Sequence, residues 1–156
     1  MEFTSEAEFE THVRALIAQK ITAEHPELFV LQNKLAVDIV ICREGPSPAV
    51  FFIEAKYVKR SSGRVGFGSG AGAGLQPEIL LKKPAYFERH LRWVFGSDMH
   101  PGAGYSFVTS DVVRKYFAAG MLGEKQNNIR EALFRETASI DESQLTSALR
   151  DWLLHT

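Results

Sequence analysis

The sequence has one cysteine among its 156 residues, so the chain cannot form an internal disulfide bond. Its five histidines are scattered, and none of them stands with Cys42 at the spacing of a zinc site. No apolar run is long enough to span a bilayer, and the N-terminal residues are acidic rather than basic as in a secretory signal. These absences exclude disulfide-rich and zinc-stabilised folds, and they lead us to expect a cytoplasmic protein that has no membrane partner.

The chain also has little excess charge of either sign, because 18 basic and 19 acidic residues give a net charge of −1. The overall charge therefore does not indicate a nucleic-acid partner. Its distribution is uneven, however: eight basic and two acidic residues lie between Lys56 and Arg92, which is a local charge of +6. We expect this segment to provide any surface that binds a polyanion.

Two short apolar runs are rich in β-branched and aromatic residues, which is typical of buried strands. They extend from Leu35 to Cys42 and from Val50 to Val58. The residues between them, Arg43 to Ala49, include one glycine and two prolines and favour a reverse turn. We therefore predict an antiparallel hairpin with Pro46 at its centre.

The predicted hairpin brings three charged side chains together. Asp38 and Glu54 are each eight residues from Pro46, so they should lie opposite each other with Cβ atoms about 4.5 to 5.5 Å apart. Lys56 lies on the same face as Glu54 because side chains alternate along a strand. Two close carboxylates repel each other, and buried charge is costly unless it is paired or bound to a metal. Two explanations for such a group of buried charges are therefore open: a salt bridge with Lys56, or a divalent metal ion bound by the two carboxylates.

The order Asp38, a spacer and then Glu54-Ala55-Lys56 resembles the signature of the PD-(D/E)xK nuclease superfamily. This superfamily includes restriction endonucleases, Holliday-junction resolvases and repair nucleases. A valine stands where that signature has its proline. The resemblance covers roughly residues 5 to 110. It implies that Asp38, Glu54 and the Ala55 carbonyl bind Mg²⁺, with Mn²⁺ as the alternative ion. It also implies that Lys56 positions the attacking water or helps to deprotonate it.

The resemblance points to two further site residues. Glu10 follows a core phenylalanine on the predicted first helix, as in a Phe-Glu-x-x-Val pattern whose glutamate helps to bind metal in some members of the superfamily. A solvated surface position is equally compatible with Glu10. Gln76 stands near the start of a predicted later helix, where many relatives have a Gln or a Lys close to the metals.

Residues Gly63 to Gly74 hold six of the twelve glycines, which is incompatible with a regular element. The segment matches neither the G-x-G-x-x-G pattern nor a phosphate loop, so we expect no nucleotide cofactor. It is either a flexible linker or a mobile flap whose backbone approaches a phosphate. The expected DNA contacts come from the basic residues around it: Lys59, Arg60, Arg64, Lys82 and Lys83.

Periodicity and turn residues predict one α/β domain over residues 1–156, in which 45% hydrophobic residues can form a single core. The expected elements are a helix over 5–23, strands over 27–32, 35–42 and 50–58, a helix over 75–94 interrupted at Pro84, a strand over 105–109, and helices over 112–119, 124–137 and 141–154. This order gives a restriction endonuclease-like αβββαβ core over about 5–110, with a mixed central sheet flanked by helices. A C-terminal helical extension follows over about 111–156.

The residues and the resemblance together predict a magnesium-dependent endodeoxyribonuclease that hydrolyses phosphodiester bonds. We expect it to be restriction-enzyme-like and to act on DNA as a homodimer. A Holliday-junction resolvase or a DNA-repair nuclease of the same fold is the alternative. The alternative of another class is a catalytically inactive module that binds nucleic acid or protein.

Overall fold

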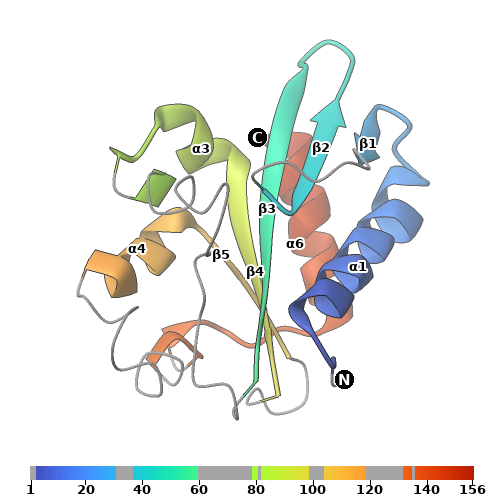
Figure 1. Ribbon diagram of the computed structural model, residues 1–156. Helices are drawn as coiled ribbons and strands as arrows, with labels where there is room; N and C mark the ends of the chain where they lie inside the picture. Colours follow the sequence, from blue (N-terminus) through green and yellow to red (C-terminus); the bar gives the residue numbers. More distant parts are fainter. Residues whose placement is uncertain are drawn as a thin grey trace.

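The chain folds into three layers, in which a central sheet is covered by helices on both sides (Figure 1). The computed structural model describes residues 3–30, 37–59, 79–80, 82–98, 104–118, 132–134 and 136–156. Helices α1 (Glu6–Ile17) and α6 (Glu142–His155) cover one side of the sheet. Helices α3 (Ala85–His90) and α4 (Ser110–Ala118) cover the other side. The predicted α/β class, with helices flanking a sheet, is confirmed.

Within the described residues the sheet contains five strands, in the spatial order β1-β2-β3-β4-β5. They are β1 (Leu28–Val30), β2 (Ile39–Arg43), β3 (Ala49–Val58), β4 (Leu91–Ser97) and β5 (Tyr105–Val108). β3 and β4 are parallel, and the other neighbouring pairs are antiparallel. The sheet is therefore mixed, as the sequence predicts.

The β2–β3 hairpin has the predicted register. Ile39 pairs with Ile53 and Arg43 pairs with Ala49, so the pairs are symmetric about position 46. Gly45 in the connection has a φ of 100°, a left-handed conformation that glycine adopts at little cost. Turn residues and strand patterning therefore suffice to predict how these two strands align.

The helix predicted over 75–94 is wrong in its last part. α3 ends at His90, and Leu91 begins β4. β4 is buried on both faces, because Val94 packs on the side of α1 and α6 while Trp93 packs on the side of α3 and α4. Such a strand is a continuous apolar run, which periodicity does not distinguish from a buried helix. The strand predicted over 105–109 is consequently the fifth strand and not the fourth.

The remaining elements agree with the predictions in type and differ at their ends. The first helix is α-helical to Ile17 and continues as a π-helix, η1, over Ala18–Thr22. Of the helix predicted over 124–137, residues 132–134, 136 and 137 are described; all of them are helical except Thr137, which lies in a bend. α6 begins with a capping box of Asp141 and Gln144. No helix in the described ranges has both the length and the apolar character needed to cross a membrane.

α1 packs closely against the centre of the sheet. Its buried side chains Phe9, Val13 and Ile17 join those of α6 in one hydrophobic cluster. Phe9 lies against Gly96 of β4, where an added Cβ atom would be 2.5 Å from the Phe9 ring. Glycine at this position therefore allows the close approach that fixes which side chains of α1 reach the β2–β3 hairpin.

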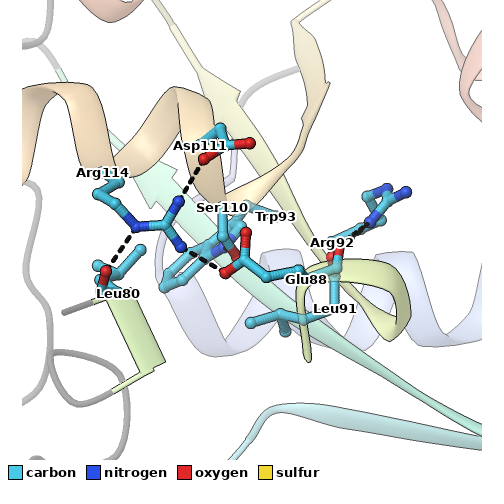
Figure 2. Close-up of polar contacts among 8 residues, drawn as sticks. All are labelled: Leu80, Glu88, Leu91, Arg92, Trp93, Ser110, Asp111 and Arg114. Carbon is cyan, nitrogen blue, oxygen red and sulfur yellow. Dashed lines mark hydrogen bonds and ion pairs between the residues drawn. The ribbon is translucent and has the colours of Figure 1, made fainter. Parts of the chain in front are cut away.

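On the other side of the sheet, a buried arginine joins α4 to α3 (Figure 2). The Arg114 guanidinium donates hydrogen bonds to the side chains of Glu88 and Asp111. It also donates to the main-chain carbonyl of Leu80 at 2.5 Å. We refer to these four residues as the Arg114 cluster. One side chain thus connects three segments of the chain.

Candidate active site

The three charged residues of the sequence motif lie where β2 begins. Asp38 immediately precedes β2, so extending the β2–β3 register by one residue places it opposite Glu54. The Asp38 carboxylate accepts a hydrogen bond from the Ala55 amide at 2.9 Å. The carboxylate is therefore held against the neighbouring strand.

Glu54 and Lys56 lie on one face of β3, and Ala55 between them packs into the core on the side of α1 and α6. Both charged side chains are buried, since Glu54 is 1% exposed and Lys56 is 5% exposed. The Lys56 ammonium nitrogen lies 3.8 Å from Glu54 Oε2. Strand alternation thus brings an acid and a base together inside the protein.

α1 adds three more charged residues, Glu6, Glu10 and Arg14, which are spaced by four and so share one helix face. Glu6 Oε1 lies 3.3 Å from the Lys56 ammonium nitrogen. Arg14 Nη2 lies 3.2 Å from Glu10 Oε1 and donates at 2.6 Å to the main-chain carbonyl of Asp38. These contacts define one group, which we call the acidic cluster: Glu6, Glu10, Asp38, Glu54, Arg14 and Lys56. It contains more carboxylates than basic groups.

The acidic cluster shifts the pKa values of several members. Burial, reinforced by the charge of Asp38, raises the pKa of Glu54 to about 9, although Lys56 opposes the shift. Burial also raises the pKa of Glu6, again against the effect of Lys56. For Lys56, burial acts to lower the pKa, but Glu6, Glu54 and Asp38 together raise it above its ordinary value. At neutral pH Glu54 therefore holds a proton, while Lys56 stays charged.

The donor atoms at the centre of the cluster are oxygens, namely the carboxylates of Asp38 and Glu54 and the Ala55 carbonyl that the resemblance adds. Among the residues whose positions are described, no group of three or more His, Cys, Asp or Glu side chains is arranged to hold a metal ion. Mg²⁺, however, is usually bound by one or two carboxylates and keeps several waters. Because a nearby cation favours the ionised form of an acid, it would offset the burial and the charge of Asp38 that together raise the pKa of Glu54. The residues present therefore fit a divalent ion.

The other predicted site residues are distributed differently. Glu10 is buried, so it does not occupy the solvated surface position that the sequence left open. Lys59 follows β3 and donates to the Thr4 carbonyl at 2.5 Å. Lys82 and Lys83 are exposed and precede α3, which lies across the sheet from α1 (Figure 1). The following predicted residues lie outside the described ones: Arg60, Arg64, Gln76 and the segment Gly63–Gly74.

Sequence reasoning missed Glu6 and Arg14 as members of this group. Glu6 lies in the first turn of α1, where a favourable interaction with the helix dipole is enough to explain an acid, so its place in the sequence gives no sign of the contact with Lys56. The signal that could have identified both residues is their four-residue spacing from Glu10. Residues that share a helix face approach the same neighbouring element.

Comparisons of the chain with protein-family models, with curated proteins and with solved structures give no match. A function for the chain therefore has to follow from the chemistry of the acidic cluster and from the sequence motif.

Proposed function

We propose that the chain is a metal-dependent DNA endonuclease of the PD-(D/E)xK type, with a restriction endonuclease-like fold. The observation that carries the proposal is the β2–β3 register, which brings Asp38, Glu54 and Lys56 together as the motif requires. The order of the elements supports it, because α1, the antiparallel strands β1 to β3, α3 and the parallel strand β4 follow one another as αβββαβ. In this reading β4, rather than β5, completes the core.

Each motif residue has a defined part in the proposed reaction. The divalent ion, which is Mg²⁺ or alternatively Mn²⁺, would be held by Asp38, Glu54 and the Ala55 carbonyl. The ion, when bound, supplies positive charge that polarises the scissile phosphate and lowers the pKa of water. The Ala55 amide orients the Asp38 carboxylate. Lys56 remains charged between Glu6 and Glu54, so its ammonium can orient the attacking water and balance the negative charge that develops on the phosphate.

DNA is the proposed substrate, and a homodimer is the proposed active form. Lys59, Lys82 and Lys83 belong to the segment of local charge +6 and would neutralise backbone phosphates. A dimer with two-fold symmetry would place one active site on each strand of a duplex. A Holliday-junction resolvase or a repair nuclease would use the same catalytic residues on a different DNA structure, so substrate preference distinguishes these alternatives.

One observation also supports a function of another class, that of a catalytically inactive binding module. Lys56 contacts both Glu6 and Glu54, which is also what a purely structural group of ion pairs would show. The chain would then bind nucleic acid or protein without cleaving it. Against this alternative, a neutral side chain at position 54 would fill the same volume without the cost of burying an acid beside Asp38.

Plasmid cleavage with and without divalent ions tests the proposal. The wild-type protein should cut supercoiled DNA with Mg²⁺ or Mn²⁺ and should lose this activity in excess chelator. Asp38→Asn and Lys56→Met should be folded and inactive. The control Glu24→Gln, which removes a surface ion pair with Arg150, should keep full activity.

Two results would contradict the proposal. Cleavage that persists in excess chelator would exclude the metal-dependent mechanism. A wild-type protein that binds DNA but cuts neither linear, branched nor flap substrates with either ion would indicate the inactive binding module.

A further inference from the structure

Asp38 is held at two points by neighbouring elements, and one of the two donors lies outside the sequence motif. The Ala55 amide of β3 donates to the Asp38 carboxylate at 2.9 Å. The Arg14 guanidinium of α1 donates to the Asp38 main-chain carbonyl at 2.6 Å. The first contact fixes the side chain, and the second fixes the backbone from which that side chain projects.

Arg14 is itself oriented by Glu10. The Arg14 Nη2 atom lies 3.2 Å from Glu10 Oε1, one helical turn earlier on α1. Both side chains are largely removed from water, so solvent screens their attraction only weakly. A guanidinium is rigid and planar, which means that a carboxylate on one donor also restricts the directions of the others. Glu10 therefore determines where Arg14 meets Asp38.

We propose that Arg14 is a positioning residue for Asp38 and that Glu10 acts by orienting Arg14. The inference rests on the proposed function, in which Asp38 is a ligand of the divalent ion. It gives Glu10 a role different from that of the third metal ligand that the resemblance implies. The Glu10 carboxylate is engaged by a guanidinium of its own helix, whereas a carboxylate that binds an ion directs its charge to that ion.

The consequence of losing Arg14 can be observed without DNA or metal. Because Arg14 acts on the main chain of Asp38, its loss should displace the carboxylate rather than remove it. The hydrogen bond from the Ala55 amide to that carboxylate then reports the displacement directly. Partners that orient a metal ligand typically change metal affinity or activity about 10- to 100-fold when they are removed.

Arg150 of α6 offers a matched control for Arg14. Its guanidinium also donates to a main-chain carbonyl, that of Lys20 at 3.0 Å, and to a carboxylate, that of Glu24 at 2.9 Å. These contacts join α6 to the end of the first helix and do not belong to the acidic cluster. Arg150→Gln therefore removes the same two kinds of contact at a different place.

The experiment compares Arg14→Gln, Arg14→Lys and Arg150→Gln with the wild-type protein. NMR of the metal-free protein records the chemical shift and exchange rate of the Ala55 amide, a Mn²⁺ titration measures ion affinity, and steady-state cleavage separates kcat from KM. Arg14→Gln should displace the Ala55 signal, weaken Mn²⁺ binding about 10- to 100-fold and lower kcat by a similar factor with little change in KM. Arg14→Lys keeps the charge and a donor, so it should recover part of each loss. Arg150→Gln should change none of the three.

Glu10→Gln separates the two roles of Glu10. The variant keeps an acceptor for Arg14 and removes the carboxylate. If Glu10 acts by orienting Arg14, Glu10→Gln should weaken Mn²⁺ binding less than Arg14→Gln does. Loss of Mn²⁺ binding in Glu10→Gln with an unmoved Ala55 signal would show instead that Glu10 is a metal ligand.

The remaining outcomes separate the inference from the proposed function. An Ala55 signal and a Mn²⁺ affinity that stay unchanged in Arg14→Gln would overturn the positioning role. If the Ala55 signal moves in Arg14→Gln but the wild-type protein neither binds an ion nor cleaves DNA, the positioning of Asp38 stands and the nuclease proposal fails. Should Arg14→Gln not fold, the Ala55 signal and Mn²⁺ affinity of Arg14→Lys decide between the same outcomes.

Discussion

The Arg114 cluster and the acidic cluster both bury ionisable side chains, but they differ in whether the acids are buried with the base. In the Arg114 cluster the cation is enclosed, with 9% of its side chain exposed, while the Glu88 and Asp111 side chains are 26% and 77% exposed. In the acidic cluster the carboxylates of Glu10 and Glu54 are themselves enclosed. The first arrangement lets the acids keep contact with water while one arginine connects three segments. The second buries Glu10 and Glu54 together with Lys56, while the Glu6 side chain stays 47% exposed.

This difference separates a structural link from a candidate site. The charge of Arg114 is matched by acceptors where it lies, so that cluster needs nothing further. The acidic cluster has more acid than base, and burial raises the pKa of Glu54 to about 9. An acid with so strongly perturbed a pKa, close to a second acid and a lysine, is more typical of a functional site than of a structural one.

The largest expected difference between the two clusters is in activity. Asp38→Asn should lower the rate of cleavage on the order of a thousandfold, equivalent to about 4 kcal/mol, because it removes a carboxylate from the proposed metal site. Arg114→Met should leave kcat/KM unchanged at a temperature at which the variant is folded. Cleavage of supercoiled plasmid measures both rates, and circular dichroism checks the folding. Comparable losses in the two variants would remove the functional distinction between the clusters.

The second prediction concerns the pH dependence of stability in the metal-free protein. Folded Glu54 keeps its proton up to about pH 9, whereas the unfolded chain releases it near pH 4.5. Between these values the folded state binds one more proton, so the free energy of unfolding should fall by about 1.4 kcal/mol per pH unit as the pH rises. Glu54→Gln should lack this contribution, while Arg114→Met should retain it. Urea denaturation in chelator at several pH values measures the slopes. Parallel slopes in wild type and Glu54→Gln would show that Glu54 does not carry the proton.

The motif residues of the acidic cluster could be predicted because they lie close together along the chain. The turn fixes the register of the hairpin, and alternation then places Asp38, Glu54 and Lys56, so local rules are enough. Glu6 and Arg14 could not be placed in this way. The face of α1 that meets the hairpin depends on how the helix packs on β4, which is a contact between residues far apart in the sequence.

β4 shows the corresponding limit for the fold. Its residues Leu91–Ser97 are buried on both faces of the sheet, so the polar and apolar alternation that marks a half-buried strand is missing. A buried helix would give a similar apolar pattern over this length. Residues Leu91–Ser97 form a strand because they pair with β3, which lies more than thirty residues earlier in the chain. The local sequence pattern does not indicate long-range strand pairing of this kind.

The third prediction tests the structural role of the Arg114 cluster. Arg114→Met should lower the free energy of unfolding by about 1 to 3 kcal/mol, because the buried Leu80 carbonyl loses the hydrogen bond that Arg114 donates to it. The control Lys115→Met removes a pair with the exposed Glu136 and should cost less than about 1 kcal/mol. Urea denaturation measures both variants. Equally small effects would mean that Arg114 does not link the helices.

The fourth prediction includes the smallest expected effect, that of Asp111→Asn, and it concerns the sign of the effect when an acid is neutralised in each cluster. Asp111→Asn should lower the free energy of unfolding by less than about 1 kcal/mol, since the Asp111 side chain lies mostly in water and its attraction to Arg114 is screened. Its position in the first turn of α4 adds only a small favourable interaction with the helix dipole. Glu54→Gln, measured at neutral pH without divalent ions, should instead raise the free energy of unfolding, because a neutral amide avoids the cost of burying an acid beside Asp38.

Parallel urea denaturation of Asp111→Asn and Glu54→Gln gives both signs in one experiment, with Arg114→Met as the reference for a broken link. A loss in Asp111→Asn as large as that in Arg114→Met would show that the arginine depends on its exposed acid, so that exposure does not distinguish the two clusters. A loss of stability in Glu54→Gln would show that the Glu54 carboxyl group contributes hydrogen bonds worth more than the cost of its burial. The acidic cluster would then be a structural network, and the case for a cation at Asp38 and Glu54 would have to come from direct ion binding alone.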